Sequence, residues 1–128
     1  MKTFAALILA AAVLCGSDGD TVYKERCASC HLVMLPLEKK QREAAVMKAP
    51  TMRMVSMRLK NMIHIKSEDE DIHRAVIVGY IRYYLEKPDE DYALCMEKML
   101  EKYGVMPPQT GLSDDEKEAV AHWIFDQF

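Results

Sequence analysis

The sequence predicts an all-α protein of about four to five helices in one compact domain. The chain has 128 residues, of which 50% are hydrophobic and 29% charged, an ordinary composition for a globular protein. No stretch alternates polar and apolar residues over a length that would predict a strand, and no internal repeat is present. Helix start and stop signals, in contrast, recur along the chain.

The first half of the chain carries three helical patterns. Apolar residues at helical spacing predict a helix over about residues 20–28. A looser segment follows, and residues 39–48 and 51–63 then show less regular helical patterns. Pro50 separates these two, because proline disfavours the helical conformation of the residue before it.

The second half has clearer boundaries. A capping box of Ser67 and Glu70 predicts the start of a long helix that ends near Glu86, and a further helix is expected over residues 91–103. A second capping box, in the stretch SDDE at 113–116, starts the last helix, which runs close to the C-terminus. Two prolines and a glycine exclude a helix between these last two elements.

The first seventeen residues, MKTFAALILAAAVLCGS, have the layout of a secretory signal, with one lysine before an unbroken apolar run. That run is too short to cross a bilayer, which takes roughly 20 residues. We therefore predict a signal peptide at 1–17, a single domain at 18–128 and a periplasmic, oxidising location. Lipid modification of Cys15 is the alternative, although the preceding Leu14 is larger than such sites prefer.

Charge is unevenly distributed along the chain. Residues 31–66 contain eight Lys/Arg and two Asp/Glu, a local charge of +6, whereas residues 67–128 contain six and fifteen, a local charge of −9. A folded chain of this kind carries a dipole that can orient it before a charged partner. The basic region is therefore a candidate docking surface for an acidic partner, and no stripe typical of nucleic-acid binding is present.

The stretch CASCH, with Cys27, Cys30 and His31, carries the most specific chemistry in the sequence. A thioredoxin-like dithiol would need a βαβ setting, and a zinc site would need a second pair of ligands at short spacing. The third interpretation is covalent attachment of one haem c. Two thiols three residues apart on a helical turn can reach both vinyl groups of a porphyrin edge, and the histidine can then bind the iron. The fourth cysteine, Cys95, is predicted to be a buried, inert thiol on a helix.

The second axial position of such an iron has several candidates. Met106 precedes two prolines, and a loop held by prolines can present a thioether to the cofactor. His64 and His73 would instead give a bis-histidine haem, but solvent-exposed or hydrogen-bonded roles are expected for them. His122 is expected on the surface. Most of the methionines between residues 47 and 62 are expected to fill apolar space by packing.

These features resemble class I c-type cytochromes of the small monohaem kind. In GDTVYKERCASCH, Gly19 lies eight residues and Tyr23 four residues before the first cysteine, as in that family, and VMPPQTGLSDDEKEAVAHWIFD is similar to its methionine loop and last helix. The resemblance implies a cytochrome c fold around one covalently bound haem, with the first and last helices crossing so that Gly19 and Tyr23 meet Trp123. The middle of the chain, residues 32–100, departs from the best-known members.

By this resemblance, Cys27 and Cys30 form the haem thioethers, His31 is the proximal iron ligand and Met106 the distal one. The implied function is that of an electron carrier without enzymatic activity of its own, working with periplasmic or membrane-bound redox proteins. The alternatives are the haem c subunit of a larger periplasmic dehydrogenase and a gas-binding haem sensor, in which Met106 would not bind the iron.

Overall fold

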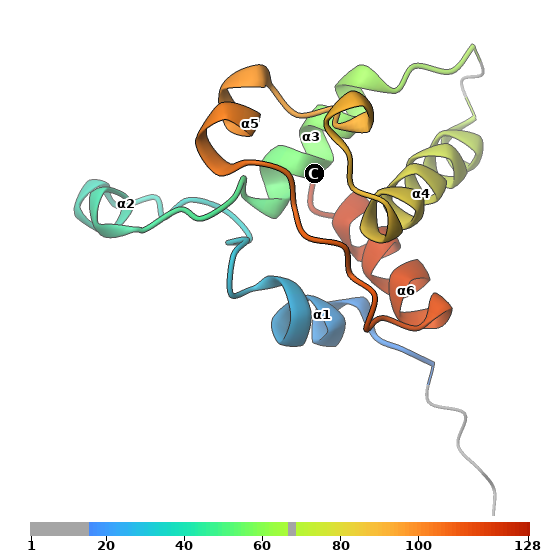
Figure 1. Cartoon of the computed structure of the whole chain (residues 1–128), viewed down its shortest axis with the longest axis horizontal. Helices are drawn as coiled ribbons and strands as arrows, with labels where there is room; N and C mark the ends of the chain where they lie inside the picture. The colour runs from blue at the N-terminus through green and yellow to red at the C-terminus, as the bar shows by residue number, and fades with distance from the viewer. Residues whose placement is uncertain (1–15, 67–68) are drawn as a thin grey trace, which may run out of the picture.

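The computed structural model of the chain describes residues 16–66 and 69–128, which contain helices and loops but no strands (Figure 1). The predicted all-α class is therefore confirmed. The signal peptide predicted at 1–17 lies largely outside the described residues, and so does Ser67. The long helix expected after the capping box begins only at Glu70, with Asp69 as its N-cap, so its predicted start at Ser67 is wrong. The elements in chain order are α1 (Gly19–Val22), the π-helix η1 (Tyr23–Cys27), α2 (Lys39–Ala44), α3 (Met52–Met62), α4 (Glu70–Glu86), the short 3-10 helix η2 (Glu90–Tyr92), α5 (Glu97–Tyr103) and α6 (Asp114–Phe125).

Most helix ends lie where local sequence signals placed them. Thr51 caps α3 by accepting a hydrogen bond from the backbone N–H of Met54 at 3.2 Å. Ser113 and Glu116 form the predicted capping box at the start of α6, each side chain bonding the other's backbone N–H. Gly104 ends α5 with a φ of 72°, a left-handed conformation that glycine adopts without strain.

Three other predicted helices are wrong in detail. The helix expected over 91–103 is broken into η2 and α5, with an irregular segment between them. The helix expected over 39–48 ends at Ala44. The helix expected over about 20–28 begins as α1 and widens into the π-helix η1, a form that is rare and is often found at functional sites.

The core is organised around α6, which packs against α1, α3 and α4 (Figure 1). Val120 and Ala121 on α6 are completely buried. One face of α4 meets them with a helically spaced row of aliphatic residues: Ile77, Val78, Ile81 and Leu85. Burial of these faces is the main force that holds the helices together.

The helix α1 crosses α6 at very close range. A Cβ atom on Gly19 would lie 2.5 Å from the Cβ of Trp123 and still nearer to the carbonyl oxygen of Ala119. The ring of Tyr23 stacks on that of Trp123 with 4.3 Å between the ring centroids. The predicted meeting of Gly19 and Tyr23 with Trp123 is therefore confirmed.

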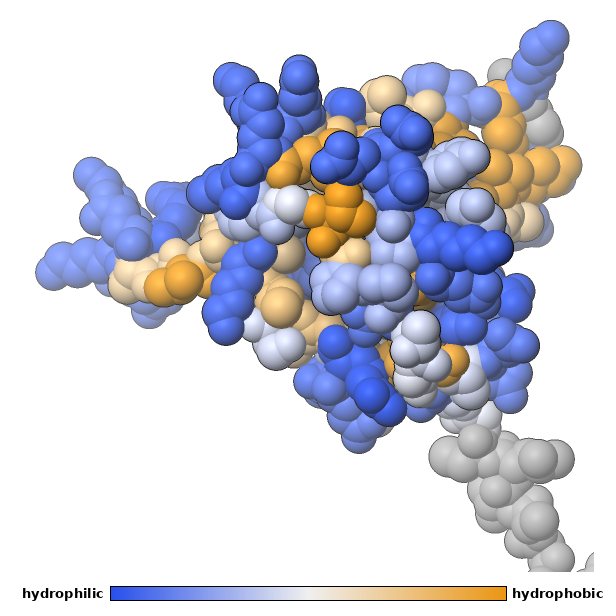
Figure 2. Space-filling model, in the orientation of Figure 1, coloured by the Kyte–Doolittle hydropathy of each residue, from blue (hydrophilic) through white to orange (hydrophobic). Residues whose placement is uncertain are grey.

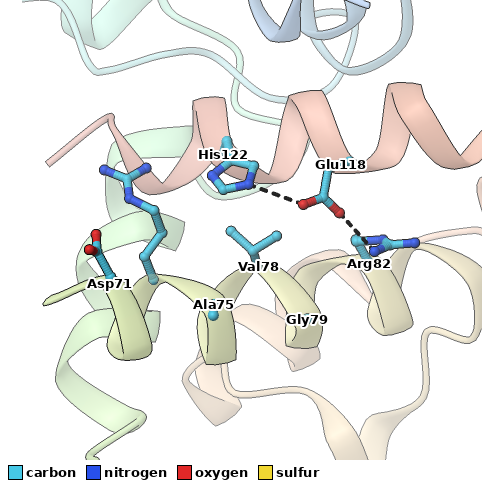
Figure 3. A pocket seen from close by; sticks show the side chains of 8 residues that line it. Asp71, Ala75, Val78, Gly79, Arg82, Glu118 and His122 are labelled. Atoms are coloured by element: carbon cyan, nitrogen blue, oxygen red, sulfur yellow. Dashed lines mark hydrogen bonds and ion pairs between the residues drawn. The ribbon is translucent and has the colours of Figure 1, made fainter. Parts of the chain in front are cut away.

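A groove lined by both charged and apolar residues runs along the α4–α6 contact (Figure 3). Its floor on α4 includes the small residues Ala75 and Gly79. The Glu118 carboxylate on α6 pairs across the groove with the Arg82 guanidinium on α4 at 2.7 Å. Along α6 itself, it also contacts the His122 ring at 3.1 Å. A Cβ atom on Gly79 would meet nothing within 4 Å.

No helix in the described part of the chain is long and apolar enough to span a membrane.

Replacing Gly19 by alanine is expected to lower the free energy of unfolding by about 1–3 kcal/mol, the usual cost of forcing atoms into a packed contact. Ordinarily alanine stabilises a helix relative to glycine, so the sign tests the close approach. The matched control is Gly79→Ala, which is expected to stabilise the protein by about 0.5–1 kcal/mol because its Cβ enters open space. Urea unfolding followed by circular dichroism measures both, and two changes of the same sign would contradict the described crossing.

Candidate haem-attachment site

The CASCH residues lie on a turn that continues directly from η1. The backbone N–H groups of Cys30 and His31 both donate to the carbonyl of Cys27, at 3.1 and 2.9 Å. The turn therefore holds two thiols and an imidazole within one short, hydrogen-bonded segment. Cys27 is buried against the core, whereas Cys30 is exposed. Burial, followed by the nearby Cys30, raises the pKa of the Cys27 thiol.

The orientation of His31 is fixed by a hydrogen bond from its ring. Nδ1 lies 2.6 Å from the carbonyl oxygen of Pro50. Because a carbonyl oxygen can only accept, Nδ1 must carry a proton, and in the neutral ring Nε2 then keeps its lone pair for an electrophile. Burial lowers the pKa of the His31 imidazole, with the Pro50 contact opposing it in part. Burial therefore favours the neutral imidazole, and the Pro50 contact selects the tautomer that metal binding through Nε2 requires.

The backbone of His31 is fixed as well. The hydroxyl of Tyr23 donates to the His31 carbonyl at 2.7 Å, from within the buried stack on Trp123. Just beyond, the N–H groups of Met52 and Arg53 donate to the carbonyls of Leu32 and Val33. The segment after the motif is thus tied to the start of α3, next to Pro50.

Met106 lies in the loop between α5 and α6, half-buried against the hydrophobic core. Two contacts hold this loop. The N–H of Gln109 donates to the carbonyl of Leu85 at the end of α4, at 2.7 Å. Further along, a Cβ atom on Gly111 would lie 3.4 Å from Nη1 of Arg26, so the loop passes beside the residue that precedes Cys27. The loop thus connects the end of α4 to the CASCH turn.

The other candidate ligands have different surroundings. His64 is exposed, and the ring Nε2 of His73 lies 2.7 Å from the carbonyl oxygen of Ile63, so the roles expected for both are confirmed. His122 is half-buried on α6 and bonds Glu118. Cys95 is only half-buried and lies in the irregular segment before α5, so its predicted place in a helix is wrong. Within the described residues, no three His, Cys, Asp or Glu side chains gather as ligands for a bare metal ion.

The methionines of α3 divide between its two faces. Met52 is buried and packs in the core with Leu59, as expected. Met54, Met57 and Met62 are partly exposed on the other side, at 36%, 36% and 44%, and their packing against a cofactor stays a prediction. Their spacing places them on a second face of the helix, and the sequence pattern could have distinguished this face from the buried one.

Two functional contacts were missing from the sequence-based interpretation. Nothing in the sequence identifies Pro50, which lies 19 residues away, as the hydrogen-bond acceptor for the His31 ring. The hydroxyl of Tyr23 was not expected to act at all. The presence of a tyrosine, rather than a phenylalanine, at a buried stacking position was the available signal, because a buried phenol needs a hydrogen-bond partner.

Fold and site together define this protein as an all-α protein with a C-x-x-C-H turn whose imidazole is oriented by a backbone carbonyl. The chain belongs to the same family as an uncharacterized protein of Aquifex aeolicus (strain VF5). The two are 32% identical over 119 residues, and the match covers 86% of this chain and 73% of the relative. No family model matches the chain, and no solved structure matches it.

Replacing Tyr23 by phenylalanine keeps the stack on Trp123 but removes the hydrogen bond to the His31 carbonyl. We expect the free energy of unfolding to fall by about 0.5–1.5 kcal/mol, the net value of one such bond. The matched control is Tyr83→Phe, because within the described residues the half-exposed hydroxyl of Tyr83 makes no hydrogen bond, and it should change stability by less than about 0.5 kcal/mol. Equal losses in urea unfolding would mean that the bond contributes nothing.

Proposed function

We propose that this protein is a monohaem c-type cytochrome that carries single electrons between redox partners outside the cytoplasm. The observation that carries the proposal is the arrangement of His31. Its protonated Nδ1 is engaged by Pro50, its Nε2 is left as a ligand, and it directly follows a pair of thiols on one turn.

The residues fit one haem c. Cys27 and Cys30 would form the two thioethers, His31 would bind the iron through Nε2, and Met106 would supply the second protein ligand from its loop. When bound, the group would supply a reversible one-electron couple, whose reduction potential would be raised by ligation through a histidine and a methionine. The chain's own contribution is to hold the imidazole neutral and oriented, and to keep the thioether-bearing loop in place through Gln109.

The tight crossing of α1 and α6 also supports the proposed cytochrome c fold. It brings Gly19 and Tyr23 against Trp123, which is the arrangement that the resemblance implies. With both axial positions filled by side chains, the iron would have no place for a substrate, which favours an electron carrier over an enzyme. The signal-like stretch at 1–17 supports export, and periplasmic or membrane-bound redox proteins are the partners that such a carrier would serve.

Replacing Met106 by alanine in protein matured by a host that attaches haem c tests the axial assignment. The variant should keep the covalently bound haem, since Cys27 and Cys30 are intact. It should also acquire stoichiometric carbon monoxide binding in the reduced state and a lower reduction potential. Mass spectrometry, the optical spectrum and a redox titration measure these properties.

The matched control for this experiment is Met62→Ala, because Met62 is an exposed methionine at the end of α3. It should leave both carbon monoxide binding and the potential unchanged. A Met106→Ala protein that behaves like the control would remove Met106 as a ligand. Wild-type protein with only the mass of the peptide would remove the proposal as a whole.

A further inference from the structure

The segment over residues 33–48, which we call the basic arm, combines exposed aliphatic side chains with a cluster of cations. The arm includes α2, which has no buried residue and lies at the edge of the molecule, away from α4 and α6 (Figure 1). On either side of α2 lie Leu37 and Val46, which are 86% and 80% exposed. The other large hydrophobic residues in the described chain are markedly less exposed. Isolated exposed aliphatics are common, but here two highly exposed side chains flank one short helix that itself has no buried residue.

Cations surround these aliphatic side chains. Lys39, Lys40, Arg42 and Lys48 are all exposed, and together with Glu38 and Glu43 they give the arm a net charge of +2. Figure 2 shows hydrophilic side chains extending around hydrophobic atoms at this end of the molecule. Only one of the cations, Lys39, is paired within the arm, with Glu43 at 3.7 Å.

We propose that the basic arm docks this protein on the surface of an anionic lipid bilayer, with Leu37 and Val46 entering the boundary between headgroups and acyl chains. This inference rests on the proposed function in one respect: docking would serve to bring the haem site close to membrane-bound redox partners. The arm begins two residues after His31, so docking through it would place the CASCH turn near the membrane face.

The charge distribution supports this orientation. The basic region over 31–66 has a local charge of +6, and residues 67–128, which include α4 and α6, have −9. An anionic surface would attract the first and repel the second, so the protein would approach with the arm toward the lipid. Because the arm is short and carries only two well-exposed aliphatics, the binding would be weak, reversible and sensitive to salt.

A bilayer fits the arm better than an acidic protein partner does. Protein interfaces are usually anchored by tyrosine, tryptophan or arginine in shaped pockets, and residues 33–48 contain no aromatic residue and a single arginine. Protruding aliphatic side chains need a matching depression on a protein, whereas a fluid lipid surface adapts to them. The occupant of the basic arm that competes with the bilayer is an acidic redox protein.

Cosedimentation of the full matured protein with vesicles tests the proposal. The vesicles are either equal parts phosphatidylglycerol and phosphatidylcholine or phosphatidylcholine alone. We expect binding to the anionic vesicles at low salt, release at high salt and no binding to the neutral vesicles. The double variant Leu37→Ser/Val46→Ser should bind about tenfold more weakly without any change in charge. Lys39→Gln/Lys40→Gln should lose about fivefold in affinity for each lysine.

Matched controls lie on other faces. Ile72→Ser/Val76→Ser removes two exposed aliphatics of α4, and Lys87→Gln/Lys98→Gln removes two exposed cations outside the arm. Both should bind like wild type. No binding at low salt, equal binding to neutral vesicles, or equal losses in arm and control variants would each overturn the proposal. So would wild-type protein that ignores the vesicles but exchanges electrons with an acidic redox protein more slowly when its arm lysines are replaced.

The fate of this proposal can be separated from that of the proposed function. The same samples are weighed by mass spectrometry for covalently attached haem. Haem-bearing protein that stays in the supernatant would overturn the membrane docking alone, whereas vesicle-bound protein with the bare peptide mass would overturn the cytochrome assignment alone.

Discussion

The contact on which the rest of this structure depends is the crossing of α1 and α6 at Gly19. The backbone of α1 comes so close to Ala119 and Trp123 that no side chain fits between the two helices. This close approach of the two helices positions the ring of Tyr23 against the ring of Trp123. The helix η1 and the CASCH turn follow directly from α1. The same contact therefore fixes the position of Cys27 in the core and the position of His31 after it.

A continuous series of contacts links this crossing to the CASCH turn, then to α3, and finally to the end of α6. The hydroxyl of Tyr23 holds the His31 carbonyl, and the ring of His31 holds the carbonyl of Pro50. The next residue, Thr51, is buried and caps α3. One turn into α3, the buried hydroxyl of Ser56 donates to the carbonyl of Phe125, at the end of α6, at 3.0 Å. His31 is therefore oriented from two sides, through its backbone and through its ring. Movement of either helix would disturb both attachments, and this coupling keeps His31 in one position.

The sequence predicted the parts of this arrangement that local chemistry determines. The capping box of α6, the glycine that closes α5 and the proline boundaries depend on residues only a few positions apart, so they can be seen in one dimension. The C-x-x-C-H spacing has the same local character. The resemblance to a known family added the meeting of Gly19 with Trp123, which no local rule could supply.

The parts that the sequence did not predict depend on contacts between distant residues. The helix expected over 91–103 breaks because side chains from elsewhere hold its first half. The hydroxyl of Tyr80 accepts from the N–H of Leu94, and the guanidinium of Arg58 donates to the Leu94 carbonyl. These bonds satisfy backbone groups that a helix would otherwise satisfy, so an irregular segment costs little. Pro50 as the partner of His31 is a long-range contact of the same kind.

The unequal burial of the two motif cysteines bears on how the proposed cytochrome would exchange electrons. Cys27 is packed in the core, and Cys30 lies at the surface on the same turn. A planar group bonded to both sulfurs would have one attachment in the apolar interior and the other beside solvent. The side of the group near Cys27 would be shielded from water, and this shielding favours a raised reduction potential. The side near Cys30 would be open to a partner. An electron could then enter and leave near Cys30 without any opening of the fold. The chain continues from this exposed edge into the basic arm, so the surface that meets a partner and the route of the electron would lie at the same end of the molecule.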